Sequence, residues 1–175
     1  HGGNAMKEAG MQILEHTDDL AIMGFIEIIK HLPRMMKIMG KTIDSISRTK
    51  PDRIILIDYP GFNLRLAKRI QHLKIPITYF ILPQVWAWKE KRVETMKAVL
   101  DQTLSIFPFE QDWFESRGLQ TNYVGHPFAE QEHLDESSKD FYQRHDITIE
   151  HPLLVLLPGS RQQEVDRHWP IFLQT

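Results

Sequence analysis

Short apolar runs recur along the chain, and longer stretches with helical spacing lie between them. Short apolar runs of this kind are typical of strands buried on both faces of a parallel sheet. The intervening stretches repeat apolar residues every three or four positions, as at Leu64, Ala67 and Ile70, which predicts helices. Strands that alternate with helices predict an α/β protein with a parallel sheet and helices on both of its faces. The predicted strands are Ile54–Ile57, Ile77–Leu82, Thr103–Phe107, Tyr123–Val124 and Leu153–Leu157.

Each predicted strand is followed by a loop in which glycine or proline accompanies polar or aromatic residues. Ligands of parallel α/β sheets bind at the carboxyl ends of the strands, so these loops together predict the rim of a cleft. Turn formation alone accounts for each loop taken separately. The loops are Asp58–Asn63, Pro83–Trp88, Pro108–Glu110, Gly125–Pro127 and Pro158–Arg161.

Asp58 directly follows an apolar strand, so we expect its carboxylate at the rim of the cleft. There the carboxylate can accept a proton from a substrate hydroxyl, which is the role of a general base. Asp and Asn are also favoured in turns and at helix starts, so a structural role for Asp58 and Asn63 stays open.

The second loop contains two indoles, and three cations follow it. Trp86 and Trp88 either pack over the rim of the sheet or form a platform for a ligand. The neighbouring loops favour a structural role for the indoles, with the cations meeting a charged substrate. We include Trp86, Lys91 and Arg92 among the predicted substrate-binding residues.

The last loop, Pro158–Arg161, lies between a predicted strand and a predicted helix. Glycine allows a ligand to approach the backbone, and amides at a helix start attract an anion. Arginine can bind phosphate oxygens through two parallel hydrogen bonds, so we expect Ser160 and Arg161 to bind phosphate. An ordinary strand-to-helix turn is the alternative.

Two further polar residues, Glu110 and His126, are candidates for substrate contact. Glu110 can equally cap the helix that follows it, and His126 can equally serve as a structural hydrogen-bond donor. The nine histidines include no His-x-x-x-His pair with an accompanying Glu, and the chain has no cysteine. We therefore expect no metal site.

The stretch from Ile22 to Met39 is both apolar and basic. One interpretation is a core helix with cations on its exposed face. The other is a surface that touches anionic lipid, where apolar area and lysine or arginine charge act together. The residues predicted to face the membrane or acyl chains are Phe25, Ile26, Ile29, Leu32 and Met36.

The amino-acid composition sets limits on the number of domains and on the possible partners of the chain. The chain has 175 residues, 42% of them hydrophobic and 25% charged, which suffices for one domain or slightly more. A formal net charge of −2 argues against a general nucleic-acid binder, so no nucleic-acid partner is expected. No run of 18 apolar residues occurs, so the sequence predicts no membrane-spanning helix.

Six motifs at these loops, in order along nearly the whole chain, resemble the lipid-A-disaccharide synthases, a family of GT-B type glycosyltransferases. The loops at Asp58 and at the two tryptophans are the most distinctive. The matching segments are Met23–Glu27, Ile57–Asn63, Pro83–Trp88 with Lys91–Val93, Pro108–Glu110, Gly125–Pro127, and Leu157–Arg161 with Glu164–Val165.

The resemblance implies transfer of 2,3-diacylglucosamine from its UDP derivative to 2,3-diacylglucosamine 1-phosphate. The products would be lipid A disaccharide 1-phosphate and UDP, and UDP-sugar is a substrate, so no cofactor is expected. It also implies that Asp58 is the general base and that Arg161 meets the phosphates of the nucleotide sugar. The expected location is cytoplasmic, peripheral on the inner face of the inner membrane.

The resemblance further implies a GT-B type Rossmann-like fold that is incomplete in this chain. Residues 1–148 would form an acceptor-side domain without its first strand, and residues 149–175 would begin the nucleotide-sugar domain. Such a fragment alone is expected to be inactive. Two alternatives stay open: a UDP-sugar 2-epimerase-like enzyme, and a non-catalytic fragment that binds lipid.

Overall fold

The computed structural model describes residues 1–17, 25–129, 137–148, 153–160 and 162–174. The chain divides into two compact units, His1–Gln131 and Glu132–Thr175, and each unit is described by itself. The domain boundary after residue 148, which the resemblance implied, stays a prediction.

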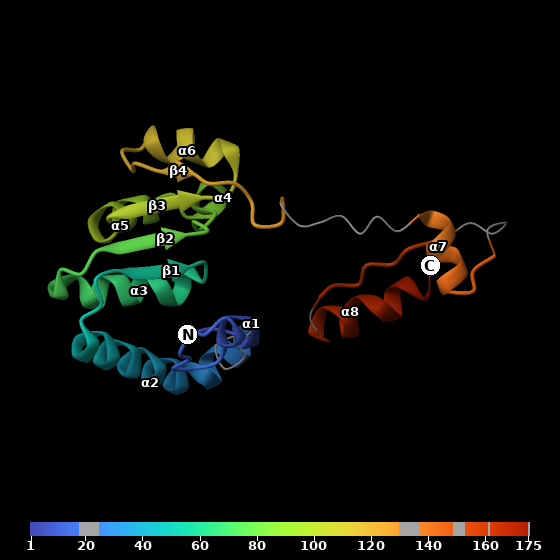
Figure 1. Ribbon diagram of the computed structural model, residues 1–175, viewed down its shortest axis with the longest axis horizontal. Coiled ribbons are helices and arrows are strands. Elements are labelled where there is room, and N and C mark those ends of the chain that lie inside the picture. Colours follow the sequence, from blue (N-terminus) through green and yellow to red (C-terminus); the bar gives the residue numbers. More distant parts are fainter. Residues whose placement is uncertain (18–24, 130–136, 149–152, 161, 175) are drawn as a thin grey trace. The chain divides into compact units, whose positions relative to one another are not determined.

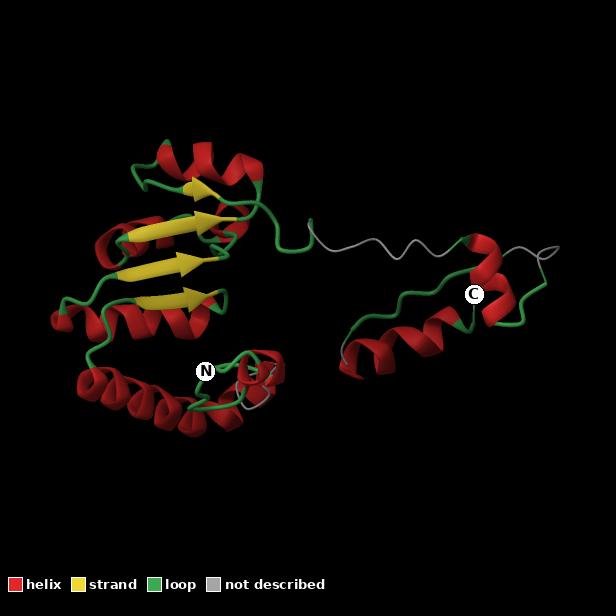
Figure 2. Ribbon diagram, in the orientation of Figure 1, coloured by secondary structure: helices red, strands yellow, loops and turns green. Residues whose placement is uncertain are grey.

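The first unit contains a parallel sheet of four strands in the order β1-β2-β3-β4 (Figures 1 and 2). Helices follow the strands along the chain, which confirms the predicted α/β class with a parallel sheet. The strands are β1 (Ile54–Ile57), β2 (Ile77–Phe80), β3 (Gln102–Ser105) and β4 (Asn122–Tyr123). The helices between them are α3 (Pro60–Ile70), η2 (Gln71–Leu73), α4 (Val85–Trp88), α5 (Arg92–Val99) and α6 (Pro108–Glu115).

The core lies on the face of the sheet that α3, α5 and α6 cover. Ile54 pairs with Ile77 and Leu56 with Tyr79, and all four side chains are buried with residues of these helices. Strands that follow one another in order across a sheet, with right-handed crossovers, place their connecting helices on one face. Burying a large apolar side chain stabilises the fold by roughly 1.5–3 kcal/mol.

The first strand, β1, differs from the expected burial on both faces. Ile55 and Ile57 are 63% and 42% exposed, whereas Ile54 and Leu56 are buried. Among the described residues, β1 is therefore packed on one face only. The helices that connect the strands cover the face that carries Ile54 and Leu56.

Two helices precede the sheet, α1 (Asn4–Glu8) and α2 (Phe25–Thr49). α2 packs against α3 and buries Ile38, Met39 and Thr42, so its C-terminal half belongs to the core. Among the described helices, none is long and apolar enough to cross a bilayer.

The second unit contains α7 (Ser138–Arg144) and α8 (Gln162–Phe172). Ser137 caps the start of α7, and its hydroxyl accepts a hydrogen bond from the Asp140 N–H at 3.2 Å. The predicted strand at Leu153–Leu157 is wrong, because residues 153–157 have no regular structure and Leu157 is 84% exposed. No strand in the described part of this unit could pair with that segment, and an unpaired strand leaves its backbone groups without partners.

Candidate active site

The turn after β1 is held by hydrogen bonds from the backbone and from side chains to the backbone around Asp58. The Asp58 N–H donates to the Phe80 carbonyl at 3.0 Å, which ties the turn to β2. The Asp58 carbonyl accepts from Asn63 Nδ2 at 2.7 Å and from the Tyr79 hydroxyl at 2.6 Å. Asn63 Nδ2 also donates to the Ile57 carbonyl at 3.0 Å. The side chain of Asn63 therefore fixes the backbone that carries Asp58.

Three residues at this end of the sheet have left-handed backbone conformations, as do Lys50 and Lys74 at the opposite end. Asp58 and Tyr59 have φ values of 45° and 44°, and Ile81, after β2, has 61°. L-residues rarely adopt this left-handed region, and each such position costs of order 1–3 kcal/mol. The network around Asp58 holds the first two of these residues in place.

The Asp58 carboxylate lies on the exposed surface, at the strand end where the sequence placed it. Among the residues that the structure describes, none donates a hydrogen bond to the carboxylate oxygens. Burial raises the pKa of Tyr79, and the nearby charge of Asp58 raises it further. The Tyr79 phenol donates to the Asp58 carbonyl and not to the carboxylate, so the carboxylate has no donor among the described residues. Its role as a base stays a prediction.

Glu110 at the start of α6 has the opposite environment. Its side chain is 0% exposed, and Oε1 accepts a hydrogen bond from Trp86 Nε1 at 3.1 Å. Within the described structure, Glu110 Oε2 and the Ser105 hydroxyl have no hydrogen-bond partner. Burial raises the pKa of Glu110, and hydrogen bonds from Trp86 and from the Phe107 and Ile106 backbone oppose that rise. Glu110 thus holds the tryptophan loop in place, and its predicted contact with substrate is left as a prediction.

The two indoles of the second loop have different surroundings. Trp86 is hydrogen-bonded to Glu110, whereas Trp88 is 69% exposed. The Lys89 ammonium lies 4.0 Å from the Trp88 ring centroid, and Arg92 Cζ lies 5.8 Å from it. Lys91 is exposed and precedes the first residue of α5. The sequence analysis included Trp86 and not Trp88 among the substrate-binding residues, and the predicted contacts of Trp86, Lys91 and Arg92 with substrate stay predictions.

Aromatic rings form a continuous row beyond the ends of β2, β3 and β4. The Trp86 and Phe109 centroids lie 5.2 Å apart, and Phe107 contacts both Phe109 and His126 at 5.9 Å. His126 also contacts Phe128 at 5.2 Å, and its Nδ1 accepts a hydrogen bond from the Phe128 N–H at 3.1 Å. His126 is therefore partly engaged in structure. Its predicted contact with substrate remains a prediction.

The glycine-serine loop of the second unit is closed on itself. The Ser160 N–H donates to Glu164 Oε2 at 3.1 Å, and His168 Nδ1 lies 2.6 Å from the Pro158 carbonyl oxygen. Gly159 has φ 129°, and a Cβ atom there would lie 2.5 Å from Glu164 Cβ, so this position requires glycine. The Glu164 carboxylate therefore accepts the hydrogen bond of the Ser160 N–H, an amide that was expected to face an anion. Arg161 lies outside the described residues.

The residues predicted to face acyl chains belong to the first half of α2. Leu32 and Met36 are 47% and 51% exposed and lie one turn apart. Phe25, Ile26 and Ile29 are helical, but their side chains lie outside the described part of the structure. The exposed pair agrees with a surface role for this helix without identifying what it touches.

Comparison with known proteins gives one consistent result. The family model described as lipid-A-disaccharide synthetase matches residues 1–175. Lipid-A-disaccharide synthase from Gluconobacter oxydans is 37% identical over 98% of this chain and 41% of its own length. The enzyme from Myxococcus xanthus is 37% identical over 97% and 44%, and lipid-A-disaccharide synthase 1 from Legionella pneumophila is 38% identical over 99% and 46%. The chain thus spans less than half the length of these relatives.

Proposed function

This chain belongs to the lipid-A-disaccharide synthetase family, and from that premise we propose that it forms the acceptor-side part of a glycosyltransferase. The reaction is transfer of 2,3-diacylglucosamine from its UDP derivative to 2,3-diacylglucosamine 1-phosphate. Its products are lipid A disaccharide 1-phosphate and UDP. The names of the relatives support a transferase over an epimerase.

Asp58 is the general base in this proposal. Its carboxylate accepts the proton of the acceptor hydroxyl while that oxygen attacks the anomeric carbon of the donor sugar. The bond from this carbon to the phosphate oxygen breaks, UDP leaves with the electron pair, and the configuration inverts. The observation that carries the assignment is an exposed carboxylate without a donor among the described residues, on a backbone locked by Asn63 and Tyr79.

An Asp58→Ala substitution tests this role in a protein of the relatives' length that contains the present sequence. We expect transfer to fall about 10²- to 10⁴-fold, since general-base catalysis contributes factors of that size. Asp52→Ala is the matched control, because Asp52 is exposed and precedes the same strand at its opposite end. Near-normal turnover in Asp58→Ala, with the melting temperature unchanged, would exclude Asp58 as the base.

Contact with a membrane is the second part of the proposal. Exposed apolar residues beside exposed cations on α2, such as Leu32 and Met36 beside Lys37, suit acyl chains and anionic headgroups. The place of action is then the inner face of the inner membrane. Leu32→Glu and Met36→Glu should each weaken binding to vesicles that contain phosphatidylglycerol, whereas Leu173→Glu, at an exposed position of the second unit, should not. Equal binding by all three variants would refute the membrane role of α2.

A further inference from the structure

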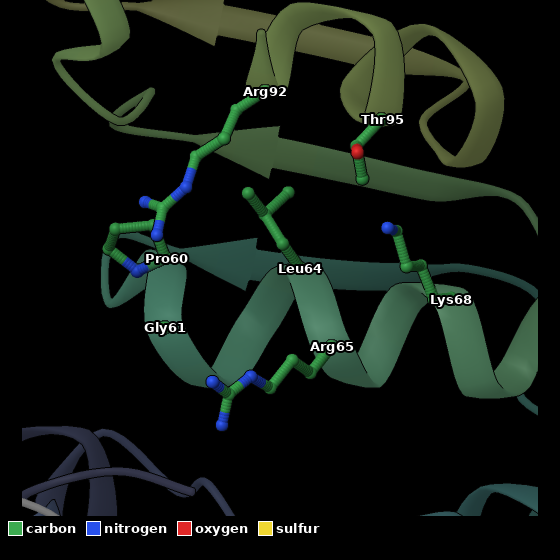
Figure 3. Close-up of a pocket in the computed structure, with 7 residues that line it drawn as sticks. All are labelled: Pro60, Gly61, Leu64, Arg65, Lys68, Arg92 and Thr95. Atoms are coloured by element: carbon green, nitrogen blue, oxygen red, sulfur yellow. The ribbon is translucent and has the colours of Figure 1, made fainter. Parts of the chain in front are cut away.

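A pocket of about 180 Å³ lies between α3 and α5, at the end of α3 that follows the Asp58 turn (Figure 3). The lining combines the first two residues of α3 with cations from both helices. Its residues are Pro60, Gly61, Leu64, Arg65, Lys68, Arg92 and Thr95.

The lining carries positive charge without a counterion. Arg65, Lys68 and Arg92 belong to it, and no acidic residue does. Within the described structure none of these three cations forms an ion pair, whereas other cations of the same unit pair with Glu15, Glu94 and Glu90. Like charges that share one pocket repel, and a bound anion relieves that repulsion. The start of α3 adds the positive end of a helix dipole.

The side chains approach the pocket from two directions (Figure 3). Arg92 reaches from α5 toward Pro60, and Lys68 extends from α3 toward Thr95, while the Arg65 guanidinium points away from both. A Cβ atom on Gly61 would meet no atom within 4 Å, so the space beside this residue is open. Arginine and lysine at the two ends, with a threonine hydroxyl between the helices, are donors suited to phosphate oxygens.

We propose that this pocket binds a phosphate monoester, namely the phosphate that the acceptor sugar carries. The identity of the sugar rests on the proposed function, whereas the anion site rests on the pocket itself. Pro60 and Gly61 directly follow the Asp58–Tyr59 turn, so a phosphate bound here anchors the acceptor next to the proposed base. Arg92 binds two phosphate oxygens, and Lys68 and Thr95 donate to the remaining oxygens.

Titration of the 175-residue chain with glucosamine 1-phosphate tests the site by calorimetry or by NMR. We expect Lys68→Gln and Arg92→Gln each to weaken binding about tenfold, a loss typical of one charge-assisted contact. Arg69→Gln is the matched control, because Arg69 is the exposed neighbour of Lys68 on α3 and does not line the pocket. An equal loss in all three variants would show diffuse attraction by surface charge and would overturn the site.

Gly61→Ala gives an independent steric test. The added methyl group meets no protein atom within 4 Å, and alanine favours a helix over glycine, so the melting temperature should rise or stay unchanged. The methyl group is added to a residue that lines the pocket, so affinity for glucosamine 1-phosphate should fall. Unchanged affinity in both Gly61→Ala and Lys68→Gln would overturn the proposal.

A lipid headgroup is a second source of phosphate, and vesicles of phosphatidylglycerol distinguish it from the sugar phosphate. Binding of glucosamine 1-phosphate that depends on Lys68, with vesicle binding independent of Lys68, supports the acceptor phosphate. Vesicle binding that depends on Lys68, without binding of glucosamine 1-phosphate, overturns the assignment to the acceptor.

Activity separates failure of this site from failure of the proposed function. In a protein of the relatives' length, Lys68→Gln should raise the acceptor KM about tenfold and change kcat less than about twofold. If Asp58→Ala keeps full activity while Lys68→Gln still weakens binding of the sugar phosphate, the function is wrong and the anion site stands. If Asp58→Ala abolishes transfer while Lys68→Gln changes neither KM nor binding, only the anion site is wrong.

Discussion

Asp58 follows β1 in a turn, and Glu110 lies in the first turn of α6 after β3, so both carboxylates lie at the same edge of one sheet, but their exposure and hydrogen-bond partners differ. Asp58 is exposed, and among the described residues no donor reaches its carboxylate, although three hydrogen bonds fix its backbone. Glu110 is 0% exposed, and the Trp86 indole donates to it at 3.1 Å. The first arrangement presents a carboxylate, whereas the second uses a carboxylate to hold a loop.

This difference shows that position after a strand predicts where a carboxylate lies but not what it does. Accessibility to a ligand depends on which side chains from other strands and helices reach the group. Substitutions at the two sites, and at the residues that support them, should therefore affect different measurements.

Truncation of the buried carboxylate should have the largest effect on stability. Glu110→Ala removes the acceptor of the Trp86 N–H and leaves a cavity under α6, so we expect a loss of about 2–3 kcal/mol in the free energy of unfolding. Urea denaturation measures this loss. Asp112→Ala, on the exposed side of the same helix, is the control and should change stability by less than about 0.5 kcal/mol. Equal stability of the two variants would contradict the assigned role of Glu110.

An apolar run in the sequence predicts a strand reliably only when a neighbouring strand is available to pair with it. Ile54–Ile57 and Leu153–Leu157 have the same apolar character, but only the first becomes a strand. Ile54–Ile57 pairs with β2 along its whole length, while residues 153–157 have no partner strand in the described part of their unit. Apolar composition indicates that a segment favours burial, whereas hydrogen-bond pairing with a neighbouring strand decides whether that segment forms a strand.

The site shows the same limit. The rule that ligands bind at strand ends predicts an exposed Asp58 carboxylate, and the structure has it exposed, while its role as a base stays a prediction. Asn63 was predicted to contact substrate; the structure shows its amide bound to the backbone of the Asp58 turn, and contact with substrate stays a prediction. Tyr79 was not found, since in the sequence it resembles any core residue of a strand, and its hydrogen bond to Asp58 spans 21 residues. The sequence did not predict the basic pocket, although it predicted that Arg92 contacts substrate, because Lys68 and Arg65 have the sequence pattern of ordinary exposed helix cations.

Removal of the Asn63 amide should loosen the Asp58 turn. Asn63→Ala deletes two hydrogen bonds to backbone carbonyls, so we expect a loss of about 1–2 kcal/mol in the free energy of unfolding, together with reduced transfer. The strained φ values of Asp58 and Tyr59 then lack part of their support. Full transfer activity at unchanged stability would show that the turn does not need this side chain.

Deletion of the Tyr79 hydroxyl should have a smaller effect. Tyr79→Phe keeps the buried ring, and Asn63 still donates to the Asp58 carbonyl, so we expect a loss of about 1 kcal/mol. Tyr79 and Asn63 share one acceptor, so the Asn63→Ala and Tyr79→Phe losses should not be additive in the double variant. Strict additivity in denaturation would mean that the two donors act on the turn independently.

The smallest effect concerns the charge of Glu110, and its direction follows from the raised pKa. Burial makes the folded state bind the Glu110 proton more tightly than the unfolded state does, so protonation favours folding. This contribution to stability is complete below the ordinary pKa of a glutamate and is lost as pH rises through the folded-state pKa. Glu110→Gln keeps an acceptor for Trp86 and cannot ionise.

The stability of the natural chain relative to Glu110→Gln should accordingly fall as pH rises from acidic to neutral values. Denaturation of both proteins across this range measures the difference, and Asp112→Asn provides the same loss of charge at an exposed position. A difference that instead grew with pH would mean that the donors around Glu110 stabilise its charge more than burial opposes it. Glu110 would then resemble a paired anion, and the contrast with Asp58 would be one of accessibility alone.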